Sequence, residues 1–99
     1  MSSPAQWLDV RLRCSKGVHA QGNAKGAVIL NAHAGVCWEL NPSGAKIWDC
    51  LASGMTARET GTHLCQVLAA EASRIADDTA ELGAQLVRAN LMVVVDDAS

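Results

Sequence analysis

Apolar and polar residues alternate in the first part of the chain and then recur at helical spacing. Over residues 8–14 apolar side chains alternate with charged ones, which is the period of a strand with one buried face. Residues 27–32 form a short continuous apolar run, typical of a central strand, and residues 36–40 alternate again. A turn at 33–35 would join these two segments into a hairpin, and residues 18–21 allow a further short strand. The pattern therefore predicts a small antiparallel sheet.

Helix signals begin directly after the last of these strands. Asn41 is a preferred N-cap residue, and the proline that follows it suits the first helical position. Gly54 suits the left-handed residue that ends a helix. Thr56 and Glu59 have the spacing of a capping box, in which two side chains bond reciprocally to backbone N–H groups. Two short helices joined by a tight turn are expected, the second from about 57 to 70.

Apolar stripes at helical spacing predict three helices after the sheet. The third is expected over about 75–89, with Asp77 and Asp78 in its first turn and Asn90 in the left-handed position after its last. Residues 91–95 form an apolar tail, which fits a short strand or a segment packed on the core. The expected inward positions are Gly44, Ile47, Trp48 and Leu51, then Gly61, Leu64, Val67 and Leu68, then Ile75, Leu82, Leu86 and Ala89.

This order of elements predicts an α+β fold. A small N-terminal antiparallel three-stranded sheet is followed by three helices, in a winged helix-turn-helix arrangement. The 99 residues fit a single domain over 1–99. A chain of this size buries only somewhat more than about 60% of its unfolded surface, so the core is modest. The sequence has neither Phe nor Tyr, so aliphatic residues and three Trp must fill that core.

Charge and composition narrow the classes of function. The formal net charge is −2, and the chain lacks the basic stripe with which nucleic-acid-binding domains neutralise phosphates. Its one basic cluster, Arg11, Arg13 and Lys16, fits the polar face of a strand. Neither a signal peptide nor an apolar run approaching the roughly 20 residues of a membrane span is evident. We therefore expect a cytoplasmic protein with no nucleic-acid and no membrane partner.

Candidate catalytic and metal-binding residues are sparse. The four cysteines are widely spaced without a C-x-x-C motif, so reduced, buried thiols are favoured over a zinc site or a redox role. A nucleophilic thiol needs a neighbouring base, and no histidine is arranged as one. There is no glycine-rich phosphate loop and no carboxylate pair suited to a metal. The sequence predicts a protein without catalytic residues, metal or cofactor.

Several motifs occur in the order typical of one family. They are an apolar strand, a strand ending in W-x-L-N, a helix containing Ile-Trp, a Gly-x-Thr turn followed by Glu, and a last helix with an Asp and two spaced leucines. Over about residues 18–93 the chain resembles the PqqD-like family of peptide chaperones, also called the RiPP precursor peptide recognition element (RiPP, a ribosomally synthesised and post-translationally modified peptide). The motif W-x-L-N-P-x-G is most similar to the corresponding motif of stand-alone family members from lasso-peptide biosynthesis. Two positions depart from the pattern, since Cys37 replaces the usual aromatic residue and Asn90 the usual glycine. The matching positions are 27–30, 35–41, Gly44, Ile47, Trp48, Gly54, Thr56, Glu59, Asp78, Leu82, Leu86 and 90–92.

The resemblance implies a binding function without catalysis. The leader segment of a precursor peptide would add as an antiparallel strand to the outer edge of 36–40, against the helix at 75–89. The protein would then present the leader to separate maturation enzymes, a leader peptidase and a cyclase. The peptide-binding residues that the resemblance implies are Val36, Cys37, Trp38, Glu39 and Leu40 on the strand, and Ile75, Asp78, Thr79, Leu82, Gln85 and Leu86 on the helix.

Some alternatives remain open at this level. A winged-helix transcriptional regulator that binds DNA has the same element order, although its recognition helix would carry only Arg74 and Arg88 as cations, at opposite ends. Asp78 fits a charge at a helix start as well as a partner for a basic leader residue. Trp38 fits a core residue as well as a residue that contacts the peptide. The charge of Glu39 fits protection of the strand edge against pairing with another chain, as well as an edge left open for a ligand.

Overall fold

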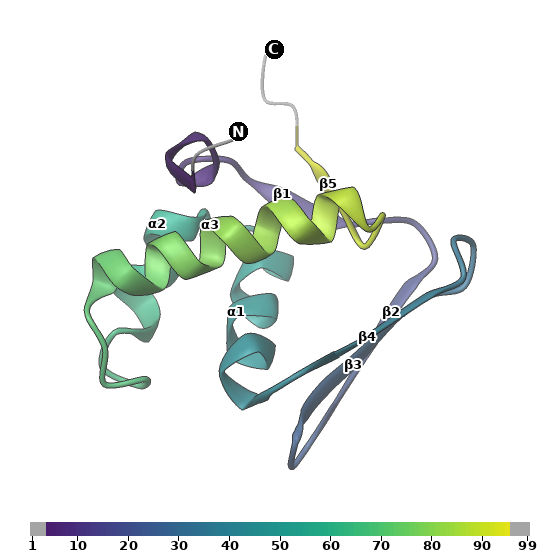
Figure 1. Ribbon diagram of the computed structural model, residues 1–99, viewed down its shortest axis with the longest axis horizontal. Helices are drawn as coiled ribbons and strands as arrows, with labels where there is room; N and C mark the ends of the chain where they lie inside the picture. Colours follow the sequence, from purple (N-terminus) through teal and green to yellow (C-terminus); the bar gives the residue numbers. More distant parts are fainter. Residues whose placement is uncertain (1–3, 96–99) are drawn as a thin grey trace.

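Figure 1 shows the computed structural model of the chain, which describes residues 4–95. It is an α+β fold in which three helices accompany a small antiparallel sheet, as predicted. Beginning with a short 3-10 helix, the elements in chain order are η1 Pro4–Trp7, β1 Leu12–Cys14, β2 Val18–Asn23, β3 Gly26–Asn31, β4 Val36–Leu40, α1 Pro42–Ala52, α2 Ala57–Leu64, α3 Ala72–Arg88 and β5 Met92–Val94.

The three-stranded sheet has the order β2-β3-β4, so β2 and β4 are its two edges. The predicted hairpin is confirmed, because β3 and β4 pair antiparallel from Ala27 opposite Leu40 to Asn31 opposite Val36. Gly26 enters β3 with a φ of +130°, and a Cβ there would lie 1.8 Å from the Leu40 carbonyl oxygen. Only glycine fits this close approach of the two strands.

The predicted start and end of α1 and the predicted start of α2 are confirmed by their caps. The Asn41 side chain accepts a hydrogen bond from the Gly44 N–H at 2.7 Å. Thr56 and Glu59 form the reciprocal capping box. Gly54 adopts a φ of +101° directly after the C-cap of α1. These local bonds satisfy backbone groups that a helix end leaves free, which is why the sequence alone indicates them.

The end of the second helix was predicted wrongly. α2 stops at Leu64 rather than near residue 70, and Val67, expected inside, is 61% exposed. The chain reverses through Ala69, whose φ is +52°, and α3 begins at Ala72. Asp77 and Asp78 therefore do not lie in the first turn of the third helix.

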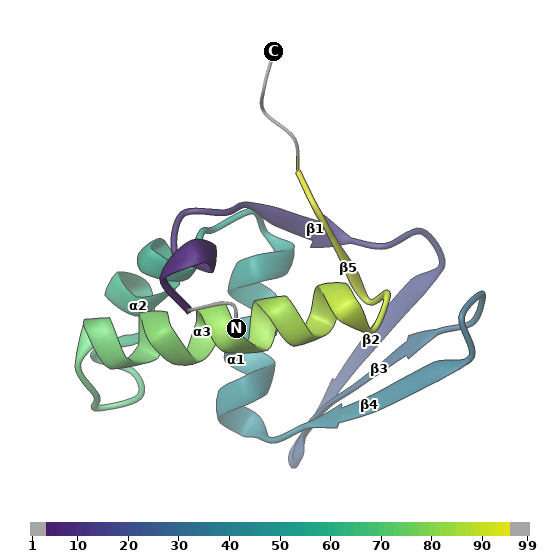
Figure 2. The ribbon, with the colours of Figure 1, turned by 45° about the horizontal axis from the view of Figure 1, so that its top comes forward.

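The α2–α3 crossing explains the early end of α2. A Cβ on Gly61 would lie 2.2 Å from the carbonyl oxygen of Ala72. The start of α3 thus packs directly against the backbone of α2, and the chain must leave α2 soon after Gly61 to make that crossing. Figures 1 and 2 both show the two helices side by side.

The N-terminal strand is shorter than the pattern at 8–14 indicated. β1 pairs antiparallel with β5, with Leu12 opposite Val94 and Cys14 opposite Met92, so the apolar tail is a strand in a second, two-stranded sheet. Of residues 1–7, which the pattern leaves without an element, 1–3 lie outside the described residues. The described part is η1, which packs against α3 and places Trp7 against the core.

The core lies where α1 meets the inner face of the sheet, α2 and α3. Trp48 is only 3% exposed, which confirms its interpretation as a core residue. Ile29, Leu86 and Leu91 are completely buried around the same cluster. Within residues 4–95, every helix is too short or too polar to span a lipid bilayer.

Candidate functional site

Strand β4 has one paired edge and one open edge. It pairs with β3 on one side, and no strand within residues 4–95 pairs with its other side. Alternate side chains on β4 differ in exposure. Val36, Trp38 and Leu40 are half-buried toward the core, while Cys37 and Glu39 are exposed. The open edge offers unpaired backbone N–H and C=O groups to an added strand.

Helix α3 presents several predicted site residues at its surface. Asp78 and Gln85 are exposed and Leu82 is half-buried, so these three are available to a ligand. Figure 2 shows α3 running past the same side of the molecule on which β4 forms the edge of the sheet. Thr79 and Leu86, by contrast, are 0% exposed. The structure therefore places these two in the core behind the helix surface and not on it.

A cavity of about 250 Å³ lies between α1 and the first turns of α3. Its floor is apolar, because Ile47 and Ile75 are almost fully buried and Leu68 and Ala70 from the α2–α3 turn complete it. The cavity begins at the first turn of α1, directly after β4 ends. The lining residues are Ser43, Ile47, Leu68, Ala70, Arg74, Ile75 and Asp78.

Two opposite charges stand at the rim of this cavity. Arg74 and Asp78 are exposed and lie one helical turn apart on α3. Neither side chain forms an ion pair or hydrogen bond with another described residue. Asp78 does not lie in the first turn of α3, so it is too far from the helix start to interact with the helix dipole there. Both charges remain available to a bound molecule.

Sequence reasoning missed five residues that line the cavity: Ser43, Ile47, Leu68, Ala70 and Arg74. Ile47 and Leu68 were expected in the core, and the α2–α3 turn that brings Leu68 to Ile75 could not be foreseen. The one signal in the sequence is the spacing of Arg74 and Asp78, because residues four positions apart on a helix are neighbours on its surface. This spacing predicts that the two opposite charges lie together.

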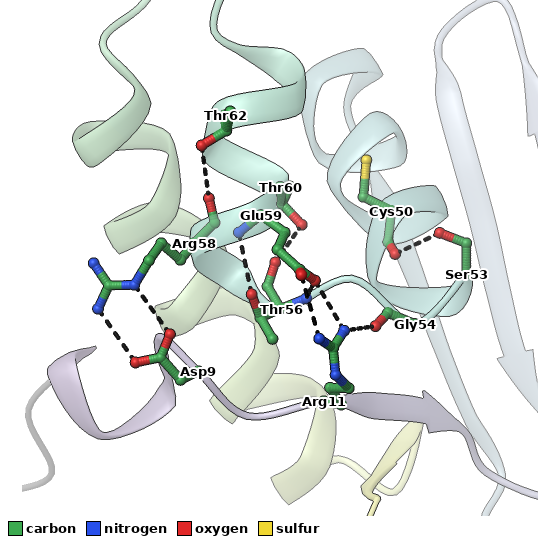
Figure 3. Close-up of polar contacts among 10 residues, drawn as sticks. All are labelled: Asp9, Arg11, Cys50, Ser53, Gly54, Thr56, Arg58, Glu59, Thr60 and Thr62. Atoms are coloured by element: carbon green, nitrogen blue, oxygen red, sulfur yellow. Dashed lines mark hydrogen bonds and ion pairs between the residues drawn. The ribbon is translucent and has the colours of Figure 1, made fainter.

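Two ion pairs lie elsewhere, at the start of α2. Figure 3 shows Asp9 paired with Arg58, and Arg11 paired with Glu59. The hydrogen bonds from Arg58 hold the pKa of Asp9 below its ordinary value, and those from Arg11 and the Thr56 backbone lower the pKa of Glu59. These groups tie the N-terminal segment to α2 and take no part in the β4–α3 surface.

The four cysteines differ in burial and surroundings. Burial raises the pKa of the Cys14 and Cys50 thiols, which disfavours the thiolate that would react. Cys37 is exposed on β4, and Cys65 donates through its Sγ to the Thr62 carbonyl oxygen. No group of three potential metal ligands occurs within the described residues.

Comparison with known proteins finds one matching family model and several structures of the same fold. A family model described as Coenzyme PQQ synthesis protein D (PqqD) matches residues 26–92. No curated protein sequence matches the chain.

Three solved structures share the fold. A lasso peptide synthetase B1 complexed with the leader peptide is 22% identical, with a TM-score of 0.74 over 84% of this chain and 98% of that one. TbiB1 in complex with the TbiA(beta) leader peptide is 20% identical, with a TM-score of 0.74 over 86% and 99% of the two chains. The solution structure of the PqqD truncation of Methylobacterium extorquens PqqCD, a RiPP recognition element, is 18% identical, with a TM-score of 0.71 over 88% and 92%.

Proposed function

The chain belongs to the PqqD family, and from this premise we propose that it binds the leader segment of a ribosomally made precursor peptide. The leader adds as an antiparallel strand to the open edge of β4 and lies against α3. The observation that carries this proposal is the unpaired edge of the hairpin strand β4, together with the exposed residues of α3 on the same side of the molecule (Figure 2). Two structures of the same fold are complexes with leader peptides, which supports the same role here.

In strand addition the backbone and the side chains make different contributions to binding. Main-chain hydrogen bonds along β4 contribute affinity that depends little on the leader sequence. Side chains of an added strand alternate between two faces, so every second leader residue points inward beside Trp38 and toward α3. Leu82 then provides apolar contact, and Gln85 and Asp78 provide polar contacts, along the helix surface.

The cavity at the start of α3 provides selectivity. Its apolar floor of Ile47, Leu68 and Ile75 suits an apolar leader side chain. Arg74 and Asp78 carry free charges at the rim. They favour a leader that places an acidic group near Arg74 and a basic group near Asp78. A charged residue in the wrong place would meet a like charge, which disfavours unrelated peptides.

The protein itself carries out no chemistry in this proposal. It captures the precursor and delivers it to a separate leader peptidase and to a cyclase, in the manner of the lasso-peptide members of its family. Purified protein mixed with precursor alone is expected to leave the precursor intact.

The DNA-binding alternative gains no support from the structure. Two of the cations, Arg11 and Arg58, are paired with carboxylates. α3 carries only Arg74 and Arg88, one at each end, so it presents no array of donors to base edges and phosphates.

A titration followed by NMR tests the proposal. The probe is a synthetic leader of the precursor encoded beside this chain, and a scrambled peptide of the same composition is the control. Backbone amide shifts should cluster at residues 36–40 and 74–85 with the leader and not with the control. Shifts confined to α2 or β1, with the β4 edge unmoved, would show that the peptide docks elsewhere.

A further inference from the structure

The sheet has a second open edge, formed by β2. β2 pairs with β3 only, and the five residues from His19 to Asn23 are all exposed. Proteins usually protect such an edge with charged side chains, proline or a bulge. β2 has the sequence VHAQGN, which contains no Lys, Arg, Asp, Glu or Pro, and its register with β3 is unbroken. This edge is therefore unprotected.

A second cavity, of about 240 Å³, lies behind this edge. It is bordered by Ala20 and Gly22 of β2 and by Ala45 of α1, whose small side chains leave the space open. Ala45 and Asp49 point to the opposite side of α1 from Ser43 and Ile47, because residues two apart on a helix differ by about 200°. α1 thus separates this cavity from the proposed leader site.

The wall of this cavity carries one charge of each sign. Lys46 and Asp49 are both exposed on α1 and lie three positions apart. Neither side chain is engaged in an ion pair or hydrogen bond with another residue in the part of the chain that the structure describes. A neighbour that presents the same two charges in reversed order would neutralise both.

We propose that the β2 edge binds the β2 edge of a second copy of this chain. A two-fold axis normal to the sheet makes the two β2 strands antiparallel and keeps both α1 helices on one face. We place Lys46 of each copy opposite Asp49 of the other, because this pairing neutralises both charges. In an isologous interface the same contact is then made twice, since residue i contacts j and j contacts i. The β2 strands bring no like charges together, because they contain no Lys, Arg, Asp or Glu.

The dimer has a continuous six-stranded sheet with one β4 edge at each end. The strand-addition sites therefore remain open, and each dimer can hold two leaders. This part rests on the proposed function, whereas dimerisation through β2 requires only the geometry of the β2 edge and of α1.

Sedimentation velocity over a wide range of protein concentration tests the interface. Wild-type protein should form a dimer as its concentration rises. Lys46→Glu and Asp49→Lys should each weaken the dimer by at least about fivefold, since each places like charges opposite one another. The double variant Lys46→Glu/Asp49→Lys should recover most of the wild-type affinity. A wild-type protein that stays monomeric throughout would overturn the proposal, as would a dimer that neither single variant weakens.

A pair of proline variants identifies the strand. Ala20→Pro and Gln21→Pro remove adjacent backbone N–H groups, of which one points to β3 and the other outward. The outward variant should keep the native circular dichroism spectrum and lose the dimer, while its leader titration at β4 stays unchanged. If both folded proline variants dimerise as wild type does, β2 is not the interface. A strand from another protein that binds β2 of a monomeric wild type would also overturn the proposal. Failed leader binding by an intact dimer would contradict only the leader-binding function.

Discussion

Arg11 and Glu59 form a bidentate ion pair although they lie 48 positions apart in the chain. Arg11 Nη1 donates to Glu59 Oε1 at 2.8 Å, and Nη2 donates to Oε2 at 3.2 Å. Arg11 also donates to the carbonyl oxygen of Gly54, where α1 ends (Figure 3). Glu59 accepts in addition from the Thr56 N–H as part of the capping box. One surface pair thus joins the approach to β1, the end of α1 and the start of α2.

The stability of the fold should therefore depend on pH through Glu59. Because its pKa is lower in the folded than in the unfolded state, the carboxylate stabilises the fold above its unfolded pKa, about 4.3. That contribution is lost as the pH falls through the lower folded pKa. Glu59→Gln should reduce stability at neutral pH and flatten the acid limb of the free energy of unfolding, measured by urea denaturation. An acid limb as steep as that of wild type would assign the pH dependence to other carboxylates, of which Asp9 is the first candidate.

Gly61→Ala should destabilise the protein by about 1–3 kcal/mol, the usual range for overpacking. The added methyl group would lie 2.2 Å from the Ala72 carbonyl oxygen and 3.1 Å from the Ala76 Cβ. Neither the Ala72 carbonyl group nor the Ala76 Cβ can move away without opening the α2–α3 contact. Thermal melting checks this, with Thr62→Ala on the exposed side of α2 as the matched control. Equal melting temperatures for the glycine variant and wild type would mean that the two helices are farther apart.

Thr79→Val should raise the free energy of unfolding by about 1 kcal/mol. The Thr79 hydroxyl is fully buried and has no hydrogen-bond partner among residues 4–95. An isosteric methyl group removes the cost of desolvating it. Leader affinity should stay at the wild-type value because the side chain does not reach the surface. Thr62→Val, exposed on α2, is the control and should show no such gain. Weaker leader binding by the Thr79 variant would instead place this residue in contact with the peptide.

Proline in β4 should separate leader binding from folding. Cys37 and Trp38 are adjacent, so one directs its N–H to β3 and the other directs it to the open edge. The variant that loses the outward N–H should stay folded and bind leader at least about fivefold more weakly, since one hydrogen bond contributes about 1 kcal/mol. The other variant should be destabilised instead.

Side-chain effects need their own controls in this experiment. Cys37→Ala and Trp38→Ala remove the same side chains and keep the backbone N–H groups. Calorimetric titration of all four variants with leader peptide gives the comparison. If each proline variant binds as tightly as its alanine counterpart, the peptide does not add to β4 as a strand.

The parts of the fold that were predictable depend on local chemistry. Asn41 and the Thr56–Glu59 pair satisfy helix N–H groups within a few residues, so the caps are visible in the sequence itself. The hairpin is equally local, because four turn residues join β3 and β4. The open edge of β4 follows from this hairpin and from the family pattern, which explains why the strand half of the site was foreseen.

The remaining features depend on contacts between distant segments. α3 has no side-chain hydrogen bond at its N-cap residue, Glu71, so nothing local marks its start. Its position depends instead on the space above Gly61. The cavity that Leu68 and Arg74 line exists only once the chain has turned there, and periodicity alone assigned Val67 to an interior that it does not reach.

The pairing of β1 with β5 bears on the order of folding. Leu12 and Val94 are about 80 positions apart, so their ladder closes the longest loop in the described chain, whereas the β2–β3 hairpin closes one of the shortest. Loop closure costs more entropy as the loop lengthens, and non-local pairing slows folding. The two-stranded sheet should therefore form after the hairpins and helices have assembled. In pulsed hydrogen exchange during refolding, amides of β3 should gain protection earlier than those of β1 and β5, and the reverse order would contradict a late closure.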